Sequence, residues 1–180
     1  MDSNLALFYL ATLVGLLAVA AWFVIRQTLR TRRMEKTLST LQNRVRSKDA
    51  TAQDFYELGG VLLDKKLYSQ AILQLQKALK AKDLKEDENK ALVYNALGFA
   101  YAAQEQYDLA IRQYKEALKL TPDYTTAWSN LGFSYEKKGL DAPALEAYQE
   151  VLQRDANNAV AKKRSESLQK RLPAPSGSNS

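Results

Sequence analysis

An all-α fold is predicted for this chain of 180 residues. It consists of one N-terminal transmembrane helix, an α-solenoid of three helix pairs and a C-terminal capping helix. Two observations predict this fold directly: an uncharged apolar run over residues 5–25, and a Leu-Gly frame that recurs three times farther along the chain. A third observation limits the classes of fold and function, because the chain holds no cysteine and no histidine. Their absence argues against a disulfide-stapled fold and removes thiolate and imidazole chemistry.

The apolar run predicts a transmembrane anchor over residues 1–25. Its 21 uncharged residues, at about 1.5 Å each, span roughly 30 Å, the thickness of the bilayer hydrocarbon. Tyr9 and Trp22 stand near its two ends, where interfacial aromatic residues are expected. A cleaved signal peptide is the alternative, with a possible cleavage site at residues 18–20. The anchor is favoured because the apolar run continues to Ile25 and no basic segment precedes it.

Residues 26–51 form a connector that carries most of the chain's excess positive charge. The net charge of the whole chain is +6, and the connector holds eight basic residues against Glu35 and Asp49. Anionic lipid attracts each basic residue near the membrane surface by about 1 kcal/mol. The residues expected to contact lipid headgroups are those closest to the anchor: Arg26, Arg30, Arg32, Arg33 and Lys36. This placement of charge favours a lipid partner over nucleic acid.

The same charges predict the topology, because basic residues beside a transmembrane helix are retained on the cytoplasmic side. The N-terminus is therefore expected outside or in the lumen, and the long C-terminal part in the cytoplasm or stroma. Met34, Leu38, Leu41 and Val45 also form one apolar stripe along the connector. A helix that extends the anchor and lies against headgroups or the first repeat is favoured. A parallel coiled-coil dimer remains the alternative, although two heptads are few for it.

A large residue, Leu-Gly and a second large residue recur at fixed spacing on three predicted helices. The three copies are Phe55-x2-Leu58-Gly59-x2-Leu62, Tyr94-x2-Leu97-Gly98-x2-Tyr101 and Trp128-x2-Leu131-Gly132-x2-Tyr135. A second helix follows each copy, marked by Ala71-x3-Leu75, Ala110-x3-Tyr114 and Ala144-x3-Tyr148. This pattern resembles the tetratricopeptide repeat, in which small residues let paired helices approach closely.

The repeat boundaries follow from the spacing of the glycines. Gly98 and Gly132 are 34 residues apart, which is the period of the family, whereas Gly59 and Gly98 are 39 apart. A five-residue insertion is therefore expected around residues 81–90, lengthening the second helix of repeat one or forming a loop beyond it. The predicted repeats cover about 52–85, 91–124 and 125–158 of a repeat domain at 52–171. A capping helix at 159–171 and a disordered tail at 172–180 complete the chain.

The resemblance implies a protein-binding groove on the concave face, lined by the first helix of each pair. The positions carried over are Tyr56, Leu63, Asn95, Phe99, Asn130, Phe133 and Lys137. Phe99 and Phe133 occupy the same position in successive repeats and suggest an apolar contact with a partner. Alternatively, the terminal helix or the connector folds back and covers them. The Lys, Arg and Asn pattern of relatives that bind chaperone C-termini is not met.

Catalysis, cofactors and metals are not predicted. Glu116, Glu136, Glu146 and Glu150 stand at helical spacing, where carboxylates are usually solvated side chains. The sequence has no glycine-rich phosphate loop and no serine-centred elbow. It therefore predicts a binding protein and not an enzyme.

The layout of the whole chain resembles the membrane-anchored tetratricopeptide photosystem I assembly proteins of cyanobacteria and plastids. The shared features are a short uncharged start, one anchor, a basic connector and three repeats with an insertion after the first. The resemblance implies a thylakoid scaffold on the stromal or cytoplasmic face that holds photosystem I subunits. Two alternatives are a membrane-bound receptor for protein targeting or translocation, and a structural organiser that dimerises through the connector.

Overall fold

The computed structural model describes the backbone of residues 2–172 and the side chains of residues 7–32 and 34–172. This range is entirely helical apart from turns and loops, which confirms the predicted all-α fold. The helices are α1 (Asp2–Arg44), α2 (Ala52–Asp64), α3 (Tyr68–Lys80), α4 (Asp87–Ala103), α5 (Tyr107–Leu120), α6 (Thr125–Lys137), α7 (Asp141–Arg154) and α8 (Ala159–Arg171). The tail predicted at 172–180 lies, apart from Leu172, outside the described residues.

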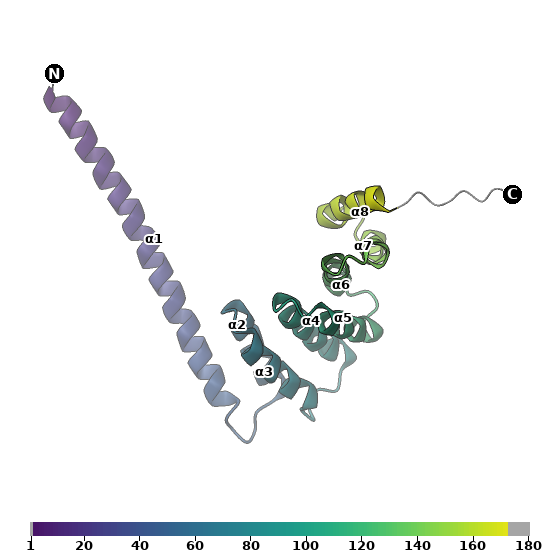
Figure 1. The fold of residues 1–180 in the computed structure, drawn as a ribbon. Helices are drawn as coiled ribbons and strands as arrows, with labels where there is room; N and C mark the ends of the chain where they lie inside the picture. Colours follow the sequence, from purple (N-terminus) through teal and green to yellow (C-terminus); the bar gives the residue numbers. More distant parts are fainter. Residues whose placement is uncertain (1, 173–180) are drawn as a thin grey trace.

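The N-terminal part of α1 projects away from a curved stack formed by α2 to α8, and its C-terminal end packs on α2 (Figure 1). The first helices of the pairs, α2, α4 and α6, form one layer of this solenoid, and α3, α5 and α7 form the other. Each helix contacts the next one along the chain, as expected where every repeat packs only on its neighbours. The buried apolar residues accordingly divide into several clusters along the solenoid.

The glycine of each repeat lies where the two helices of a pair approach most closely. A Cβ added at Gly98 would stand 2.5 Å from a ring carbon of Tyr114, and one added at Gly59 would stand 2.7 Å from Leu75 Cδ2. Both neighbours are almost completely buried. The predicted role of these glycines as contact points between paired helices is thus confirmed.

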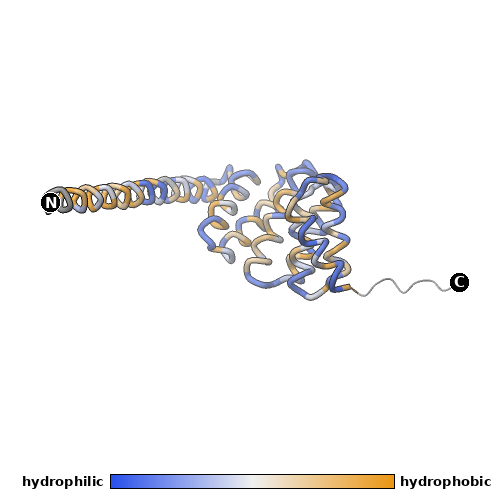
Figure 2. Tube along the Cα trace, turned by 90° about the horizontal axis from the view of Figure 1, so that it is seen from above, coloured by the Kyte–Doolittle hydropathy of each residue, from blue (hydrophilic) through white to orange (hydrophobic). Residues whose placement is uncertain are grey.

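The anchor and the connector as far as Arg44 form one continuous helix, so no helix boundary separates residues 25 and 26, and residues 45–51 form a turn before α2. Within the described residues, α1 is the one helix long and apolar enough to cross a membrane by length and composition. Apolar residues dominate its N-terminal half and hydrophilic residues increase towards its C-terminal end (Figure 2). Its apolar stripe packs on the first repeat, where Leu41 joins Leu58, Leu62 and Ala71 in one buried cluster. Three of the four residues of the stripe, Leu38, Leu41 and Val45, therefore pack within the chain.

The five-residue insertion lies around residues 81–90, as predicted, and of the two predicted forms the structure shows the loop and not a longer second helix of repeat one. Helix α3 ends at Lys80 and is not lengthened, whereas α4 begins at Asp87, four residues before the predicted start of repeat two at 91. The residues between the two helices form a loop at 81–86. Asp87 and Glu88 in the first turn favour a helix start here, because acidic side chains stabilise the positive end of the helix dipole.

Candidate protein-binding groove

Two phenylalanines remain exposed on the face formed by the first helices. Phe99 of α4 is 47% exposed and Phe133 of α6 is 37% exposed, although both directly follow buried Leu-Gly pairs. Successive residues on a helix point about 100° apart, so the glycines face the partner helix while the phenylalanines face outward. Helix α8 packs on α7, and α1 packs on α2. Both phenylalanines are thus left partly exposed, and of these two helices α8 borders Phe133 through Arg164.

Asparagine and tyrosine side chains form a hydrogen-bonded network along the same face. Asn130 Nδ2 donates to Asn95 Oδ1 at 3.0 Å, and Asn95 Nδ2 donates to the hydroxyl of Tyr124 at 3.2 Å. Burial is the main cause that raises the pKa of Tyr124, followed by its proximity to Tyr56. The hydrogen bonds thus join two predicted residues, Asn95 of α4 and Asn130 of α6, and extend to Tyr124. They fix these side chains before any partner binds, which lowers the entropic cost of binding.

The C-terminal end of the groove is bordered by charged side chains. A cavity of about 240 Å³ is lined by Phe133, Glu136, Lys137 and Arg164. The ammonium of Lys137 lies 5.5 Å from the centre of the Phe133 ring, a cation–π arrangement. Arg164 of α8 pairs with Glu136 at 3.1 Å. An apolar surface therefore continues here into a basic rim, which suits an apolar segment with acidic neighbours.

Leu63 differs from the other predicted groove residues. Its side chain is half-buried and packs against both hydrophobic clusters at the N-terminal end of the solenoid. It therefore contributes to the packing of α2 more than to an accessible surface. The repeat-one part of the groove is formed by Tyr56, beside a smaller cavity of about 110 Å³ between α2 and α4.

Comparisons with known proteins agree with this architecture. Two family models match, described as "TPR repeat" over residues 100–139 and "Tetratricopeptide repeat" over residues 125–158. A tetratricopeptide repeat domain-containing chloroplastic protein of Arabidopsis thaliana, PYG7, is 44% identical over 95% of this chain, which spans 56% of PYG7. The protein ycf37 of Cyanophora paradoxa is 37% identical over 91% of this chain and 95% of its own length. The chain belongs to the ycf37 family of tetratricopeptide-repeat proteins.

Solved structures show the same fold at lower identity. MamA superposes with a TM-score of 0.71 over 79% of this chain and 81% of MamA, at 22% identity. The first tetratricopeptide domain of Spaghetti (RPAP3), solved with the HSP90 peptide SRMEEVD, has a TM-score of 0.63 and 21% identity, covering 69% of this chain and 94% of that domain. These likenesses concern the fold. Together with the family membership, this fold is consistent with a protein-binding scaffold.

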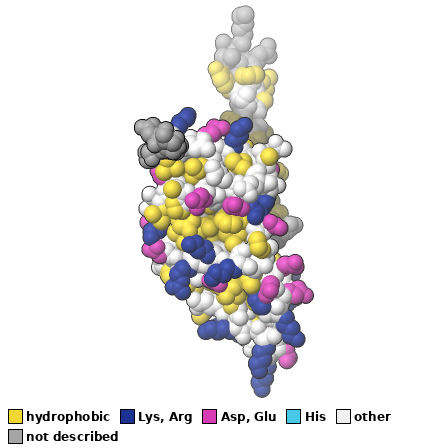
Figure 3. All heavy atoms as spheres, turned by 90° about the vertical axis from the view of Figure 1, so that its right-hand side faces the viewer, with side chains coloured by type: hydrophobic (Ala, Val, Ile, Leu, Met, Phe, Trp, Pro, Cys, Tyr) yellow, Lys and Arg dark blue, Asp and Glu magenta, His cyan; other side chains and the backbone are white. Residues whose placement is uncertain are grey.

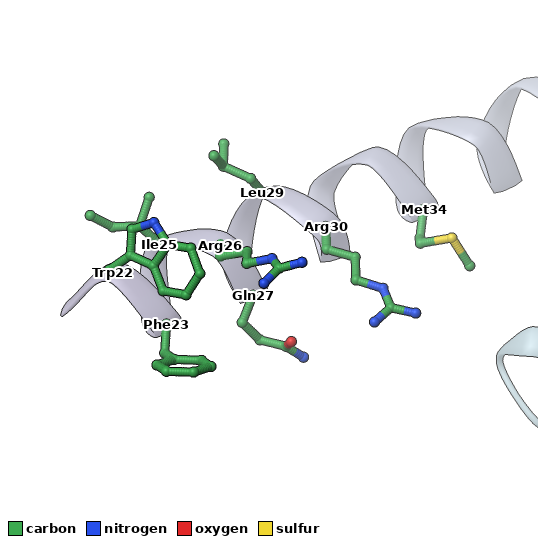
Figure 4. A pocket seen from close by; sticks show the side chains of 8 residues that line it. All are labelled: Trp22, Phe23, Ile25, Arg26, Gln27, Leu29, Arg30 and Met34. Carbon is green, nitrogen blue, oxygen red and sulfur yellow. The ribbon is translucent and has the colours of Figure 1, made fainter. Parts of the chain in front are cut away.

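The predicted lipid-contacting residues lie along α1 where it leaves its apolar half. Arg26, Arg30, Arg32 and Lys36 are exposed, and the side chain of Arg33 lies outside the described residues. The guanidinium of Arg26 stands 5.3 Å from the centre of the Trp22 ring. Arg26 and Arg30 follow Trp22 and Phe23 along this part of the helix (Figure 4). An aromatic residue followed by exposed cations is typical of the boundary between hydrocarbon and headgroups.

Some residues of the site were not predicted. Tyr124 precedes α6 and belongs to the loop between repeats, so its position in the repeat pattern does not mark it as a groove residue. Arg164 reaches the groove from α8, which was predicted only as a cap. The outer side of the solenoid carries another cavity of about 340 Å³ between α5, α6 and α7, lined partly by Trp128, Tyr135 and Leu118. Hydrophobic side chains are visible in the middle of this side (Figure 3).

Proposed function

We propose that this protein is a membrane-anchored scaffold that holds subunits of photosystem I during their assembly or stabilises the complex. The observation that carries this proposal is the groove with Phe99 and Phe133 partly exposed beside a preformed Asn95–Asn130 network. Similarity along almost the whole chain to a chloroplastic relative supports a plastid or cyanobacterial membrane as its place of action. The photosystem I assignment rests on the resemblance of the chain's layout to assembly proteins of that complex.

The membrane topology is part of the proposal. Helix α1 crosses the thylakoid membrane with its N-terminus in the lumen, and the solenoid lies on the stromal or cytoplasmic side. The exposed cations Arg26, Arg30 and Lys36, which follow the apolar half of α1, support this orientation. Protease added to membranes whose stromal or cytoplasmic surface faces outward should digest the solenoid. Complete protection of the solenoid would contradict the topology.

The function is tested by affinity purification of the full chain from detergent-solubilised membranes. We expect photosystem I subunits to co-purify, and the double variant Phe99→Ala and Phe133→Ala to lose most of them while keeping its helicity. The matched control removes two exposed leucines outside the groove, Leu73→Ala and Leu140→Ala, which are 52% and 40% exposed. Equal recovery with both double variants would contradict the groove. Recovery of translocation components in place of photosystem subunits would favour a targeting receptor.

A further inference from the structure

The last helix of the solenoid presents lysines on its outer side. Lys162, Lys163 and Lys170 are exposed and form no ion pair among the described residues, and we call these three the α8 lysines. Glu166 is the single acidic residue of the helix. A terminal repeat needs a polar outer face to stay soluble, but solubility requires no particular sign of charge. The excess of lysine on the outer side of α8 therefore favours contact with a negatively charged surface.

The orientation of α8 is fixed by its inner side. Ala161, Ser165 and Leu168 are buried against α7. Arg164 and Arg171 are held by ion pairs, at 3.1 Å to Glu136 and 3.0 Å to Asp141 respectively. Lys163 and Lys170 each lie two positions from a buried residue, about 200° around the helix, and so point away from the solenoid.

The solenoid leaves the C-terminal end of α1 at an angle, and α8, at the far end of the stack, reaches farthest back in the direction of the N-terminal half of α1 (Figure 1). In Figure 1, the chain turns at the C-terminal end of α1, and the stacked helices then rise until α8 stands beyond α7 on the side of the N-terminal half of α1. The row of α3, α5 and α7 lies farther from that half than the row of α2, α4 and α6. A bilayer surface that crosses α1 near Arg26 would therefore face the outer side of α8.

We propose that the α8 lysines dock on the anionic surface of the same bilayer that holds α1. The solenoid is then attached at both ends, and its groove opens towards the membrane. This inference rests on the proposed membrane anchoring of α1, and it specifies the partner of the groove further. A segment that reaches Phe99 and Phe133 must lie close to the bilayer surface, as do the extramembrane loops and tails of membrane-embedded subunits.

The strength of this contact follows from the charge of the lysines. Each lysine near an anionic surface strengthens binding roughly fivefold, so the three together shift the ratio of docked to undocked solenoid by roughly a hundredfold. The attraction is screened by salt, because the Debye length falls from about 8 Å at physiological ionic strength to about 3 Å at 1 M. Docking should therefore depend on both anionic lipid and low salt.

The absence of cysteine from the chain allows a direct test by site-specific labelling. A fluorophore is attached to the full chain through Ser167→Cys on α8, or through Arg112→Cys on α5 as a distant control, since both residues are exposed. The proteins are reconstituted in vesicles that carry a quencher on a lipid headgroup. In vesicles containing phosphatidylglycerol, we expect strong quenching at residue 167 and weak quenching at residue 112. In phosphatidylcholine alone or at 1 M salt, quenching at residue 167 should fall to the level at residue 112.

Charge reversal separates docking from general electrostatic effects. Lys162→Glu, Lys163→Glu and Lys170→Glu together should abolish the quenching at residue 167. The matched control, Lys80→Glu, Lys82→Glu and Lys85→Glu, changes the net charge equally at exposed lysines around the α3–α4 loop and should preserve it. Circular dichroism checks that both variants stay helical. Quenching at residue 167 that is weak in anionic vesicles, or that survives reversal of the α8 lysines, overturns the proposal.

A third outcome is also informative. If the α8 reversal reduces co-purification of protein subunits while residue 167 stays far from the lipid in every vesicle, the lysines bind an acidic protein surface and the membrane contact is wrong. These vesicles contain no photosystem subunits. Failure of docking is thus distinguishable from failure of the proposed assembly function, which is measured by co-purification.

Discussion

The two ends of the solenoid are closed in different ways. At the N-terminal end, α1 contributes Leu41, which is only 5% exposed, to a cluster with Leu58, Leu62 and Ala71, and Leu38 and Val45 pack around it. At the C-terminal end, α8 buries two small residues and one large apolar one, Leu168. The buried hydroxyl of Ser165 has no hydrogen-bond partner among the described residues.

Ion pairs contribute at both ends, but they have different roles. Glu35 pairs with Lys65, and Arg44 lies 3.7 Å from Asp54, beside an apolar contact that already holds α1 on the first repeat. Arg164 and Arg171 link α8 to the solenoid where apolar burial is small. Partly exposed ion pairs stabilise by about 1 kcal/mol or less. From this comparison we expect apolar packing to hold α1 on the first repeat, and α8 to depend on Leu168 and on its ion pairs.

The largest expected effect comes from removing one leucine at each end. Leu168→Ala should destabilise α8 by about 3 kcal/mol, because the side chain is fully buried and a cavity remains. Since Leu168 is the main apolar residue holding α8, the whole helix should lose its protection from hydrogen exchange. Leu41→Ala should cost about 2 kcal/mol and leave α1 docked, because Leu38 and Val45 keep their contacts.

Hydrogen exchange of the full chain in detergent micelles measures both changes, helix by helix. Gln169→Ala, at an exposed position beside Leu168, serves as the control and should leave α8 protected. The effects of the two leucine variants should add in the double variant, because the ends are distant from each other. Loss of protection in α2 on Leu41→Ala that exceeds the loss in α8 on Leu168→Ala would reverse the ranking of the two ends.

The helix pairs were predictable from the sequence because their determinants are local. A glycine in one helix and a small residue at a fixed distance in the next helix predict that the two helices pack closely. In the structure, Gly98 of α4 accordingly lies against Tyr114 of α5. The start of α4 was not predictable from the period of the repeat. Residues 81–90 are mostly charged, and only the order of Glu86, Asp87 and Glu88 distinguishes the first turn of a helix from a loop.

The candidate groove was predictable in part. Phe99 and Phe133 follow from their position in the repeat, since that position faces outward in every repeat. The link from Asn95 to Tyr124 and the approach of Arg164 to Glu136 join residues about 30 positions apart. They depend on the rotation between successive repeats and on the packing of α8. A pattern within one repeat contains no information about either.

A smaller effect is expected from adding a methyl group where the paired helices of the first and last repeats contact each other. In Gly59→Ala, the new methyl would stand 2.7 and 2.8 Å from two carbons of fully buried Leu75, so Leu75 must move. Such overpacking costs about 1–3 kcal/mol, against a gain of about 1 kcal/mol from replacing glycine in a helix. In Gly132→Ala, the closest atom of Tyr148 is 3.0 Å away, and the two effects should nearly cancel.

Urea denaturation of the two variants in the same micelles measures this difference. We expect Gly59→Ala to lower the free energy of unfolding by about 1 kcal/mol and Gly132→Ala to leave it almost unchanged. Gly60→Ala is the matched control, because no atom lies within 4 Å of the added methyl and the helix propensity alone should stabilise α2. Equal destabilisation by Gly59→Ala and Gly132→Ala would mean that the repeats at the two ends are packed equally tightly.

The smallest expected effect concerns the N-terminal caps of α2 and α8, the helices at the two ends of the solenoid. At α2, the Thr51 hydroxyl accepts from the Asp54 backbone N–H at 3.2 Å, and the Asp54 carboxylate accepts from the Thr51 backbone N–H at 3.0 Å. That backbone hydrogen bond is the main cause that lowers the pKa of Asp54 below its ordinary value of 3.8, followed by the hydroxyl of Thr51. At α8, the cap is the amide oxygen of Asn158, which accepts from Ala161 N–H and does not titrate.

Acid should therefore weaken the start of α2 and not the start of α8. Because the pKa of Asp54 is lower in the folded chain than in the unfolded chain, its contribution to stability is complete above about pH 4 and is lost as the pH falls through the folded value. A cap of this kind is worth up to about 1 kcal/mol. Hydrogen exchange in the first turn of α2, compared at each pH with Asp54→Asn, isolates this contribution. The difference between the two proteins should shrink upon acidification, whereas exchange at the start of α8 should be the same in both. A difference that does not shrink at all as the pH falls below the ordinary pKa of 3.8 would show that the carboxylate's charge does not stabilise this cap.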